Sequence, residues 1–496
     1  MATVTVHDAV DRIDVDAVNS KEKRELYKAR EPIFPKKVTG RFRTAKWWIM
    51  AVTLGIYYVT PWLRWDRGPF APDQAVLIDI ANSRFYFFFI EIWPQEFFFV
   101  AGLLIMAGVG LFLITSTVGR AWCGYTCPQT VWVDLFLVVE RMIDGDRNAQ
   151  IKLAKTPWTA DKVVKRTVKH SLWLVIAMAT GGAWIFYFAD APTLAIDFVT
   201  GEASHYAYIT VGILTATTYG FGGHMREQVC TYMCPWPRIQ AAMLDEHSMV
   251  VTYNDWRGEP RSRHKKAREA EPEQFGDCID CNQCVAVCPM GIDIRDGQQL
   301  ECITCALCID ACDNVMDKVG SPRGLISYST LHDYERRAAG ESVRHDWTTI
   351  FRTRTLIYFG AWSLIGLVML LALFSRDRLD LSVLHDRNPV FVQLSDGSVR
   401  NGYTLKISNM LNHPRSFAVE LEGLPGAAMS LASDEQPPRR RVEIDVPANE
   451  LRSVKLYVTQ EQAASDSARQ SFDLLLHDLT DGERADYRAI FNRPEP

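Results

Sequence analysis

Eight cysteines between positions 278 and 312 have the spacing of ligands for iron–sulfur clusters. They form two runs of the pattern C-x₂-C-x₂-C-x₃-C, and the second run begins 24 residues after the first, which indicates an internal duplication. In such a run three cysteines bind one cubane and the fourth reaches the neighbouring cluster. The sequence therefore predicts two 4Fe–4S clusters, one bound by Cys278, Cys281, Cys284 and Cys312, the other by Cys302, Cys305, Cys308 and Cys288.

Zinc binding and a purely structural role explain these cysteines less well. A zinc site usually takes four ligands in two separated pairs, whereas this sequence has two complete quartets. Apolar residues interleave with the ligands, and we expect them to surround the clusters with a low-dielectric shell. They are Ile279, Val285, Ile292, Ile303, Leu307 and Ile309. Because clusters of this type carry single electrons, the motif predicts electron transfer.

The other four cysteines form two pairs of the pattern C-x₃-C-P, Cys123 with Cys127 and Cys230 with Cys234. Cysteines four residues apart share a helix face, and the following proline suits the first turn of a new helix. Four thiols could bind a soft ion such as Cu(I), form a reversible disulfide, hold a further iron–sulfur cluster, or simply be buried. Three neighbours of the second pair are additional candidate copper ligands: His224, Met225 and Met233.

Five apolar segments look long enough to cross about 30 Å of hydrocarbon. They are residues 47–63, 97–116, 170–189, 206–223 and 356–374, of which the first and fourth are at the lower limit of length. The polar residues 1–46 do not resemble a cleavable signal peptide, because the first apolar run begins only at Trp47. A sixth apolar stretch, 131–143, is too short to span and is expected to be an amphipathic interfacial helix.

The distribution of Lys and Arg predicts the orientation of these segments. Residues 1–46 hold eleven, 64–96 three, 120–169 nine and 190–205 none, and 224–353 is rich in them, including Arg263, Lys265, Lys266 and Arg268. The positive-inside rule then places the N-terminus and every cysteine in the cytoplasm of a bacterium, and the C-terminal part in the periplasm. Thiols in the reducing compartment remain available for metals.

The predicted fold class is multi-domain, with an α-helical membrane domain, a cytoplasmic bacterial-type two-cluster ferredoxin domain and a C-terminal immunoglobulin-like β-sandwich. Strands of alternating polarity at 417–421, 442–446, 454–458 and 472–476 indicate the sandwich, with about seven strands and turns at 396–397, 401–402 and 412–414. The expected boundaries are 1–46 (N-terminal segment), 47–240 (four spans and both C-x₃-C-P motifs), 241–353 (ferredoxin-like domain), 354–376 (fifth span) and 377–496 (sandwich).

Several functions find no support in the composition and motifs. The net charge of −5 with 23% charged residues favours no nucleic-acid partner. The sequence has no C-x-x-C-H haem motif, no Walker A loop and no strand–GxGxxG–helix unit. Without a nicotinamide or flavin site, the electrons must come from another protein or from a quinol, and the sequence leaves this donor unknown.

With these motifs in place, the chain resembles the cytochrome oxidase accessory proteins of the CcoG family, also called FixG or RdxA. The resemblance covers nearly the whole length and includes both C-x₃-C-P motifs, the duplicated cysteine run, and the stretches 91–96, 385–389 and 396–403. It implies a membrane-bound metal-ion reductase, converting Cu(II) to Cu(I), that helps to assemble a cbb-type haem–copper oxidase in the inner membrane. The ferredoxin cysteines would relay the electron, and the catalytic, copper-binding residues would be Cys123, Cys127, Cys230 and Cys234.

The same resemblance implies partners among the oxidase assembly factors and copper chaperones or transporters. Whether the chain forms a homodimer is left open. Two alternatives remain. One is a quinol-linked membrane electron carrier similar to the NapH and NosR proteins, which share both kinds of cysteine motif. The other is a redox sensor or docking protein whose clusters only report.

Overall fold

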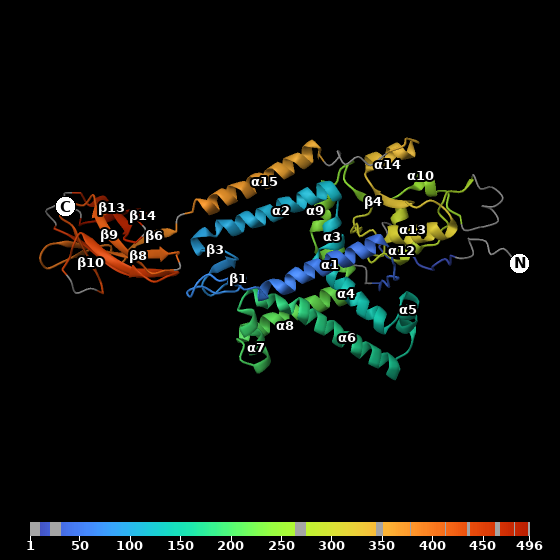
Figure 1. The fold of residues 1–496 in the computed structure, drawn as a ribbon, viewed down its shortest axis with the longest axis horizontal. Coiled ribbons are helices and arrows are strands. Elements are labelled where there is room, and N and C mark those ends of the chain that lie inside the picture. Colours follow the sequence, from blue (N-terminus) through green and yellow to red (C-terminus); the bar gives the residue numbers. More distant parts are fainter. Residues whose placement is uncertain are drawn as a thin grey trace. The chain divides into compact units, whose positions relative to one another are not determined.

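The computed structural model of the chain describes residues 10–19, 31–262, 274–343, 351–376, 378–411, 413–433, 437–461, 467–480 and 482–494 (Figure 1). Contacts divide the chain into two compact units. The first comprises Met1–Leu63 with Ala75–Met369, and the second Arg64–Gln74 with Leu370–Pro496. The first unit is mainly helical and contains all twelve cysteines, whereas the second is built from strands.

Six longer helices form the frame of the first unit: α1 (Arg41–Val59), α2 (Phe98–Val118), α4 (Pro128–Ile143), α6 (Ala160–Thr180), α8 (His205–Tyr219) and α15 (Thr353–Phe374). Between them lie shorter helices and turns: η2 (Thr60–Trp62), η3 (Pro94–Glu96), α3 (Ala121–Tyr125), α5 (Arg147–Lys155), η4 (Gly182–Tyr187), α7 (Ala191–Thr200), η5 (Gly220–Met225), η6 (Val229–Met233) and α9 (Trp236–Met243). A small antiparallel sheet precedes α2, with strands β1 (Val76–Asp79), β2 (Arg84–Phe87) and β3 (Ile90–Ile92).

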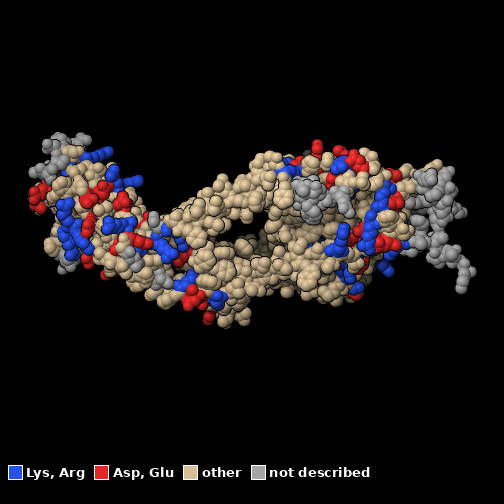
Figure 2. All heavy atoms as spheres, turned by 45° about the horizontal axis from the view of Figure 1, so that its top comes forward, with Lys and Arg blue, Asp and Glu red and all other residues tan. Residues whose placement is uncertain are grey.

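Among the described residues, three helical segments are long and apolar enough to cross a membrane: Pro94–Val118, Ala160–Tyr187 and Thr353–Phe374. The prediction of five such segments was therefore wrong. The first predicted span coincides with α1, whose opening turns contain Arg41, Arg43 and Lys46. The fourth coincides with α8, whose 15 residues extend only about 22 Å. Figure 2 shows a largely uncharged surface over the long helices of this unit, while charged side chains gather at the end where Figure 1 shows α10 (Asp255–Gly258), α12 (Gln283–Ala286) and α13 (Leu307–Val319).

Helices α2 and α15 pack antiparallel through close contacts at glycine. A Cβ on Gly102 would lie 2.6 Å from the Met369 sulfur, and one on Gly366 would lie 3.2 Å from the Met106 methyl. Helices α6 and α8 form a second antiparallel pair, in which Gly181 meets the Thr218 hydroxyl. Small residues allow helix backbones to approach closely, which is how apolar helices associate without a hydrophobic driving force.

The predicted helix 131–143 corresponds to α4, eight residues of which are buried inside the protein. Asp134 on α4 binds two cations of α1, Arg43 Nη1 at 3.0 Å and Lys46 Nζ at 2.9 Å. Burial alone would raise the pKa of the Asp134 carboxyl, but Lys46 and Arg43 hold it below its usual value. Glu140, a second buried carboxylate on α4, forms ion pairs with Lys169 of α6 and with Arg226, the residue after η5.

The region that carries the duplicated cysteines follows α9. It consists of the antiparallel strands β4 (Val250–Tyr253) and β5 (Ile326–Ser329) with α10 (Asp255–Gly258), α12 (Gln283–Ala286), η8 (Ile294–Asp296), α13 (Leu307–Val319) and α14 (Leu331–Ala338). Residues 10–19 and 31–40, the N-terminal strap, lie against the first cysteine loop. Three of the strap's backbone N–H groups donate to carbonyls of that loop: Ile13 to Cys281, Asn19 to Gly291 and Lys36 to Ala286.

The second unit confirms the predicted β-sandwich, but its described residues form nine strands rather than about seven. They are β6 (Leu379–His385), β7 (Val392–Gln393), β8 (Val399–Asn409), β9 (Arg415–Glu422), β10 (Ala428–Leu431), β11 (Arg441–Val446), β12 (Glu450–Gln460), β13 (Arg469–Asp478) and β14 (Arg484–Asn492). One sheet has the order β10-β12-β8-β6 with β7 beside β8, and the other has β11-β9-β13-β14. Every pairing is antiparallel. Both sheets contribute fully buried side chains to the core, such as Leu405, Phe417, Val458 and Leu474.

Two turns that the sequence predicted in this unit have opposite outcomes. The expected turn at 396–397 is present, and Gly397 adopts a φ of +84° there. The expected turn at 401–402 is wrong, because Asn401 lies inside β8, fully buried, and donates to the Asn492 carbonyl at 2.8 Å. Asn412, in the third expected turn, lies outside the described residues, as do Arg263, Lys265, Lys266 and Arg268.

Replacing Asp134 with Asn is expected to destabilise the protein by about 3–5 kcal/mol at neutral pH, because two buried cations lose their partner. The pKa of Asp134 is lowered by folding, so its contribution is complete above the unfolded-state pKa of about 4 and fades as the pH falls below it. The difference between D134N and the wild type should therefore shrink on acidification. Thermal unfolding of the detergent-solubilised protein across pH measures this.

The matched control is Asp161→Asn, which removes an exposed carboxylate paired with Lys165 one turn away. An exposed pair of this kind contributes at most about 0.5 kcal/mol. Equal losses of stability in D161N and D134N would show that the buried pair has no special role.

Candidate metal centre

The two cysteine loops repeat an unusual backbone conformation as well as a sequence pattern. Asp280 and Asn282 have φ values of +50° and +56° in the first loop, and their counterparts in the second, Thr304 and Ala306, have +57° and +60°. A non-glycine residue in this region costs about 1–3 kcal/mol and persists only where its surroundings impose it. Four such residues at equivalent positions curl each loop in the same way around its cysteines.

The fourth cysteine of each run lies beside the other run's first three. Cys312 is within electrostatic range of Cys278, Cys281 and Cys284. Cys288 is within range of Cys302 and Cys305, and also influences Cys308. Cys308 and Cys312 are one turn apart on α13, so this single helix contributes a thiol to each set. We call Cys278, Cys281, Cys284 and Cys312 the first set, and Cys302, Cys305, Cys308 and Cys288 the second set.

The surroundings of both sets are apolar, as predicted. Val285, Ile292, Ile303, Leu307 and Ile309 are each at most 6% exposed, and Ile279 is partly buried against the same core. Burial raises the pKa of the Cys302 thiol to about 11 and that of Cys288 to about 12. Thiols in this environment stay neutral until a metal replaces the proton.

The donor chemistry fits 4Fe–4S clusters better than single ions. All twelve cysteines are free thiols. Among the described residues no three His, Cys, Asp or Glu side chains converge closely enough to hold one metal ion. A cubane takes one thiolate at each of four separated irons, so two quartets of buried and partly buried thiols suit it. When bound, each cluster supplies one-electron transfer.

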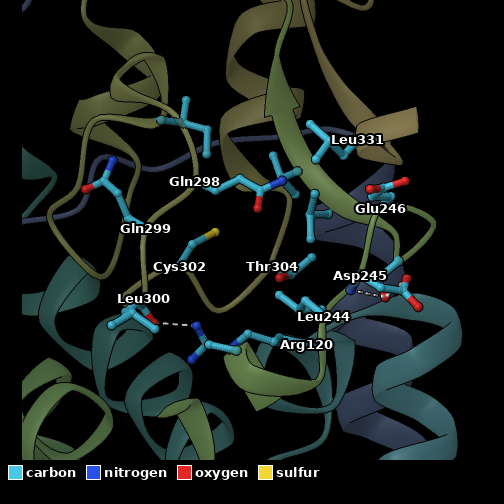
Figure 3. A pocket seen from close by; sticks show the side chains of 15 residues that line it. Arg120, Leu244, Asp245, Glu246, Gln298, Gln299, Leu300, Cys302, Thr304 and Leu331 are labelled. Carbon is cyan, nitrogen blue, oxygen red and sulfur yellow. Dashed lines mark hydrogen bonds between the residues drawn. The ribbon is translucent and has the colours of Figure 1, made fainter. Parts of the chain in front are cut away.

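A cavity of about 460 Å³ lies beside the second set (Figure 3). Cys302 and Thr304 form part of its wall, together with Leu244 and Leu331. Arg120, from the connection between α2 and α3, also lines it and donates to the Leu300 carbonyl. The second set therefore has a cation and an open volume on one side.

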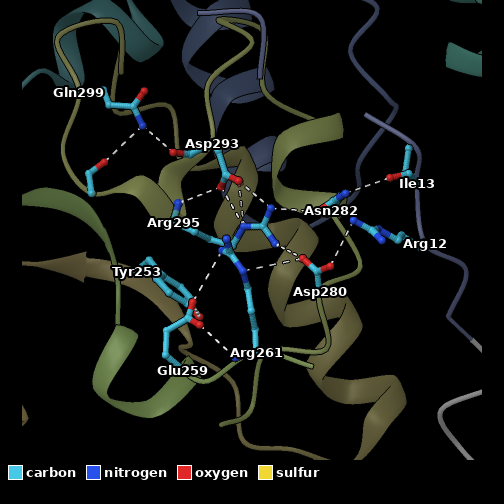
Figure 4. A network of polar contacts seen from close by, with 11 residues as sticks. Arg12, Ile13, Tyr253, Glu259, Arg261, Asp280, Asn282, Asp293, Arg295 and Gln299 are labelled. Atoms are coloured by element: carbon cyan, nitrogen blue, oxygen red, sulfur yellow. Dashed lines mark hydrogen bonds and ion pairs between the residues drawn. The ribbon is translucent and has the colours of Figure 1, made fainter. Parts of the chain in front are cut away.

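A different arrangement flanks the first set, where Arg295 is fully paired (Figure 4). Its guanidinium contacts Asp293 at 2.6 Å and Asp280 at 2.9 Å, and donates to the Asn282 amide oxygen at 2.8 Å. Arg12 of the strap adds a second cation to Asp280, at 3.3 Å. Charge near the first set is thus balanced by neighbouring carboxylates.

The two C-x₃-C-P pairs, far apart in sequence, come together as four neighbouring thiols. Cys123 lies on α3 and Cys127 immediately precedes α4, while Cys230 lies on η6 and Cys234 just after it. Cys230 is within electrostatic range of the other three. Pro128 begins α4 as predicted, and α9 begins one residue after Pro235. We call these four cysteines the thiol tetrad.

The thiol tetrad packs directly on the second set. Cys123 and Cys230 belong to the same apolar cluster as Cys288, Cys302 and Cys305. Helix α3 approaches the second loop so closely that a Cβ on Gly124 would lie 2.7 Å from the Ile303 carbonyl oxygen. The adjacent Tyr125 hydroxyl donates to the Cys305 carbonyl at 3.3 Å. Electrons on the second set would therefore have a short path to the tetrad.

Sequence reasoning missed several residues around the tetrad. The Cys123 thiol donates to the Gln240 amide oxygen at 3.2 Å, and Gln240 in turn donates to the Thr115 hydroxyl. Gln240 and Arg120 carry no motif of their own, although the glycine between Cys123 and Cys127 could have indicated a close backbone approach. The additional copper candidate His224 stacks on His170 with ring centroids 5.7 Å apart, and Met233 is half exposed.

Comparisons with known families match most of the chain. A family described as a 4Fe-4S dicluster domain matches residues 225–331, a 4Fe-4S binding domain matches 98–141, and an Ig-like fold at the C-terminus of FixG matches 369–494. The chain is 60% identical to the nitrogen fixation protein FixG of Rhizobium meliloti, covering 98% of this chain and 97% of that one. It is 55% identical to the protein RdxA of Cereibacter sphaeroides, covering 90% and 93%.

Among solved structures, the crystal structure of a FixG-related protein from Vibrio parahaemolyticus covers 24% of this chain and 99% of its own. The identity is 20% and the TM-score 0.21.

A double substitution tests whether the fourth cysteines cross between the sets. Cys288 and Cys302 belong to the same set if they cross, so C288A/C302A should lose one cluster and keep about four of about eight irons per chain. The matched control C284A/C288A removes one ligand from each set and should lose both clusters. Iron and sulfide analysis after anaerobic purification measures this, and the opposite ranking of the two variants would exclude the crossed arrangement.

Proposed function

The chain belongs to the FixG/RdxA family of iron–sulfur proteins, and from this premise we propose that it is a membrane-bound cupric reductase. It reduces Cu(II) to Cu(I) during assembly of a cbb-type haem–copper cytochrome oxidase. The observation that supports this most is the packing of the thiol tetrad on the second set, with Cys123 and Cys230 in one cluster with Cys302. An electron carrier thus lies beside four ligands that favour Cu(I).

In this proposal copper binds at the tetrad and is reduced there, which requires the four thiols to draw together, since no three of them lie close enough to hold one ion in the described structure. Thiolates stabilise Cu(I) relative to Cu(II) and so raise the reduction potential of the bound ion. The reaction transfers one electron, from a reduced 4Fe–4S cluster to Cu²⁺, giving Cu⁺ and the oxidised cluster. No proton or bond is exchanged in that electron transfer itself.

The protein's own groups prepare the tetrad for this ion. Burial raises the pKa of the Cys123 thiol to about 11 and that of Cys230 to about 12. Binding a soft cation at these partly buried thiols therefore displaces protons. Gln240 orients Cys123 through its hydrogen bond.

A third 4Fe–4S cluster is the second candidate for the tetrad. It is favoured by the match of residues 98–141, which include Cys123 and Cys127, to a family described as a 4Fe-4S binding domain. The two candidates differ in iron content, with about eight irons per chain if the tetrad takes copper and about twelve if it takes a cluster.

We infer the membrane orientation from the distribution of Lys and Arg and from where the helices meet the cysteine-bearing region. The end of α2 and the residue before α15 both reach the segment that leads into β4, through Gly119 packed on Met249 and through Arg352 paired with Asp245. We place the cysteine-bearing region in the cytoplasm of a bacterium and the sandwich in the periplasm. The partners are a copper donor and the oxidase being assembled.

Replacing all four tetrad cysteines with Ser should lower the rate of Cu(II) reduction at least about tenfold. A tenfold change in rate corresponds to only about 1.4 kcal/mol in the activation free energy. The protein is reduced with dithionite, freed of excess reductant anaerobically and mixed with Cu(II). A colorimetric Cu(I) chelator follows the product.

Two controls accompany this variant. Its iron content must equal that of the wild type, so that the clusters are intact. Met225→Leu/Met233→Leu removes the neighbouring thioethers and should keep the wild-type rate. Undiminished Cu(I) formation by the four-serine variant would remove the tetrad from the mechanism.

Reporter fusions test the orientation. Alkaline phosphatase folds only where disulfides form, so a fusion after Pro496 should be active and an insertion after Ser342 inactive. Activity at the second position would place the cysteines outside the cytoplasm.

A further inference from the structure

Arg120 is a buried cation whose charge has no counter-ion among the described residues. It is 3% exposed, and one nitrogen donates to the Leu300 carbonyl. Its Nε and second Nη atoms have no hydrogen-bond partner in the described structure. A buried charge is costly unless it is paired, so the presence of the Arg120 guanidinium at this position calls for an explanation.

The guanidinium lies between the second set and the thiol tetrad. It shares the wall of the 460 Å³ cavity with Cys302 (Figure 3). Its charge also favours the thiolate form of Cys302 on one side and of Cys123 and Cys230 on the other. Arg120 is three residues before Cys123, so the close approach of α3 to the second loop fixes it in this place.

Arg295, the corresponding cation near the first set, has a different environment. Two carboxylates, Asp293 and Asp280, bind it at 2.6 and 2.9 Å (Figure 4). The cation at the first set is therefore directly paired with carboxylates, whereas Arg120 at the second set has no carboxylate within ion-pair distance among the described residues, although Asp245 and Glu246 line the same cavity. A nearby positive charge stabilises the more negative, reduced state of a cluster and raises its potential.

We propose that Arg120 makes the two cluster sites unequal, so that the second set holds the higher-potential cluster and electrons run from the first set toward the thiol tetrad. Each transfer moves one electron from the first cluster to the second, with no proton and no change of bonding. Arg120 is a positioning residue, since it acts through the field at the cysteines. The inference rests on the proposed function only in naming the tetrad as the destination of the electron.

The test is an EPR-monitored redox titration of the full-length, anaerobically purified protein, with dithionite as reductant. In Arg120→Gln one cluster should titrate at a lower potential. At its wild-type midpoint its reduced-to-oxidised ratio should fall at least about tenfold, which is 59 mV for a one-electron couple. Arg120→Lys, which keeps the charge, should leave both midpoints near the wild type, as should Arg141→Gln, which removes a half-buried arginine elsewhere.

A further variant assigns the signal. Arg295→Gln should shift the other cluster and spare the one that Arg120→Gln moves. If R120Q loads less iron than the wild type, Arg120→Met provides the second neutral side chain. Unchanged midpoints in the neutral variants, equal shifts of both clusters, or a shift in R120K as large as in R120Q would overturn the proposal.

The same titration separates this inference from the proposed function. A wild type that cannot reduce Cu(II) would contradict the cupric reductase, yet a selective shift in R120Q would still support the role of Arg120. Normal copper reduction by the wild type, combined with unchanged midpoints in R120Q, would support the cupric reductase and contradict the role of Arg120.

Discussion

The reciprocal placement of the fourth cysteines is the constraint on which the rest of the site depends. Because Cys312 lies with the first loop and Cys288 with the second, neither loop has a complete set of ligands alone. Helix α13 must supply a thiol to each side, and the strained residues Thr304 and Ala306 tolerate positive φ to keep the second loop curled. The loops therefore behave as one rigid body, and helix α3 can be positioned against it.

Rigid placement matters because the thiol tetrad is assembled from two segments about a hundred residues apart. Gly124 allows the backbone of α3 to touch the second loop, and Gln240 links Cys123 to α9 and α2. Buried carboxylates hold the supporting helices in register, Asp134 toward α1 and Glu140 toward α6. Helix packing and buried ion pairs together fix the distance between the two cysteine pairs of the tetrad. Neither C-x₃-C-P motif could fix that distance alone.

The sequence predicted the parts of the molecule that local spacing determines. Cysteine runs, alternating strands such as 417–421 and the proline at the start of α4 are local signals, and the structure follows them. It did not predict the strap, Arg120 or Gln240, because their roles come from contacts across more than a hundred residues. The counts of spans and strands failed for a related reason. Helix α1 can carry Arg43 and Lys46 because both form ion pairs with the buried Asp134. Asn401 can lie inside a strand because its buried amide donates to the Asn492 carbonyl.

The N-terminal strap has a consequence for biogenesis. Its backbone bonds join Ile13 to Cys281 and Asn19 to Gly291, so these residues cannot settle until the ribosome has made about 270 more. At about 5–20 residues per second this takes roughly 15–50 s. The strap is therefore still unbound when the first cysteine loop is translated, and it can close only once that loop is complete. A loop that received its cluster before the strap closed would hold the inorganic core beneath these backbone bonds.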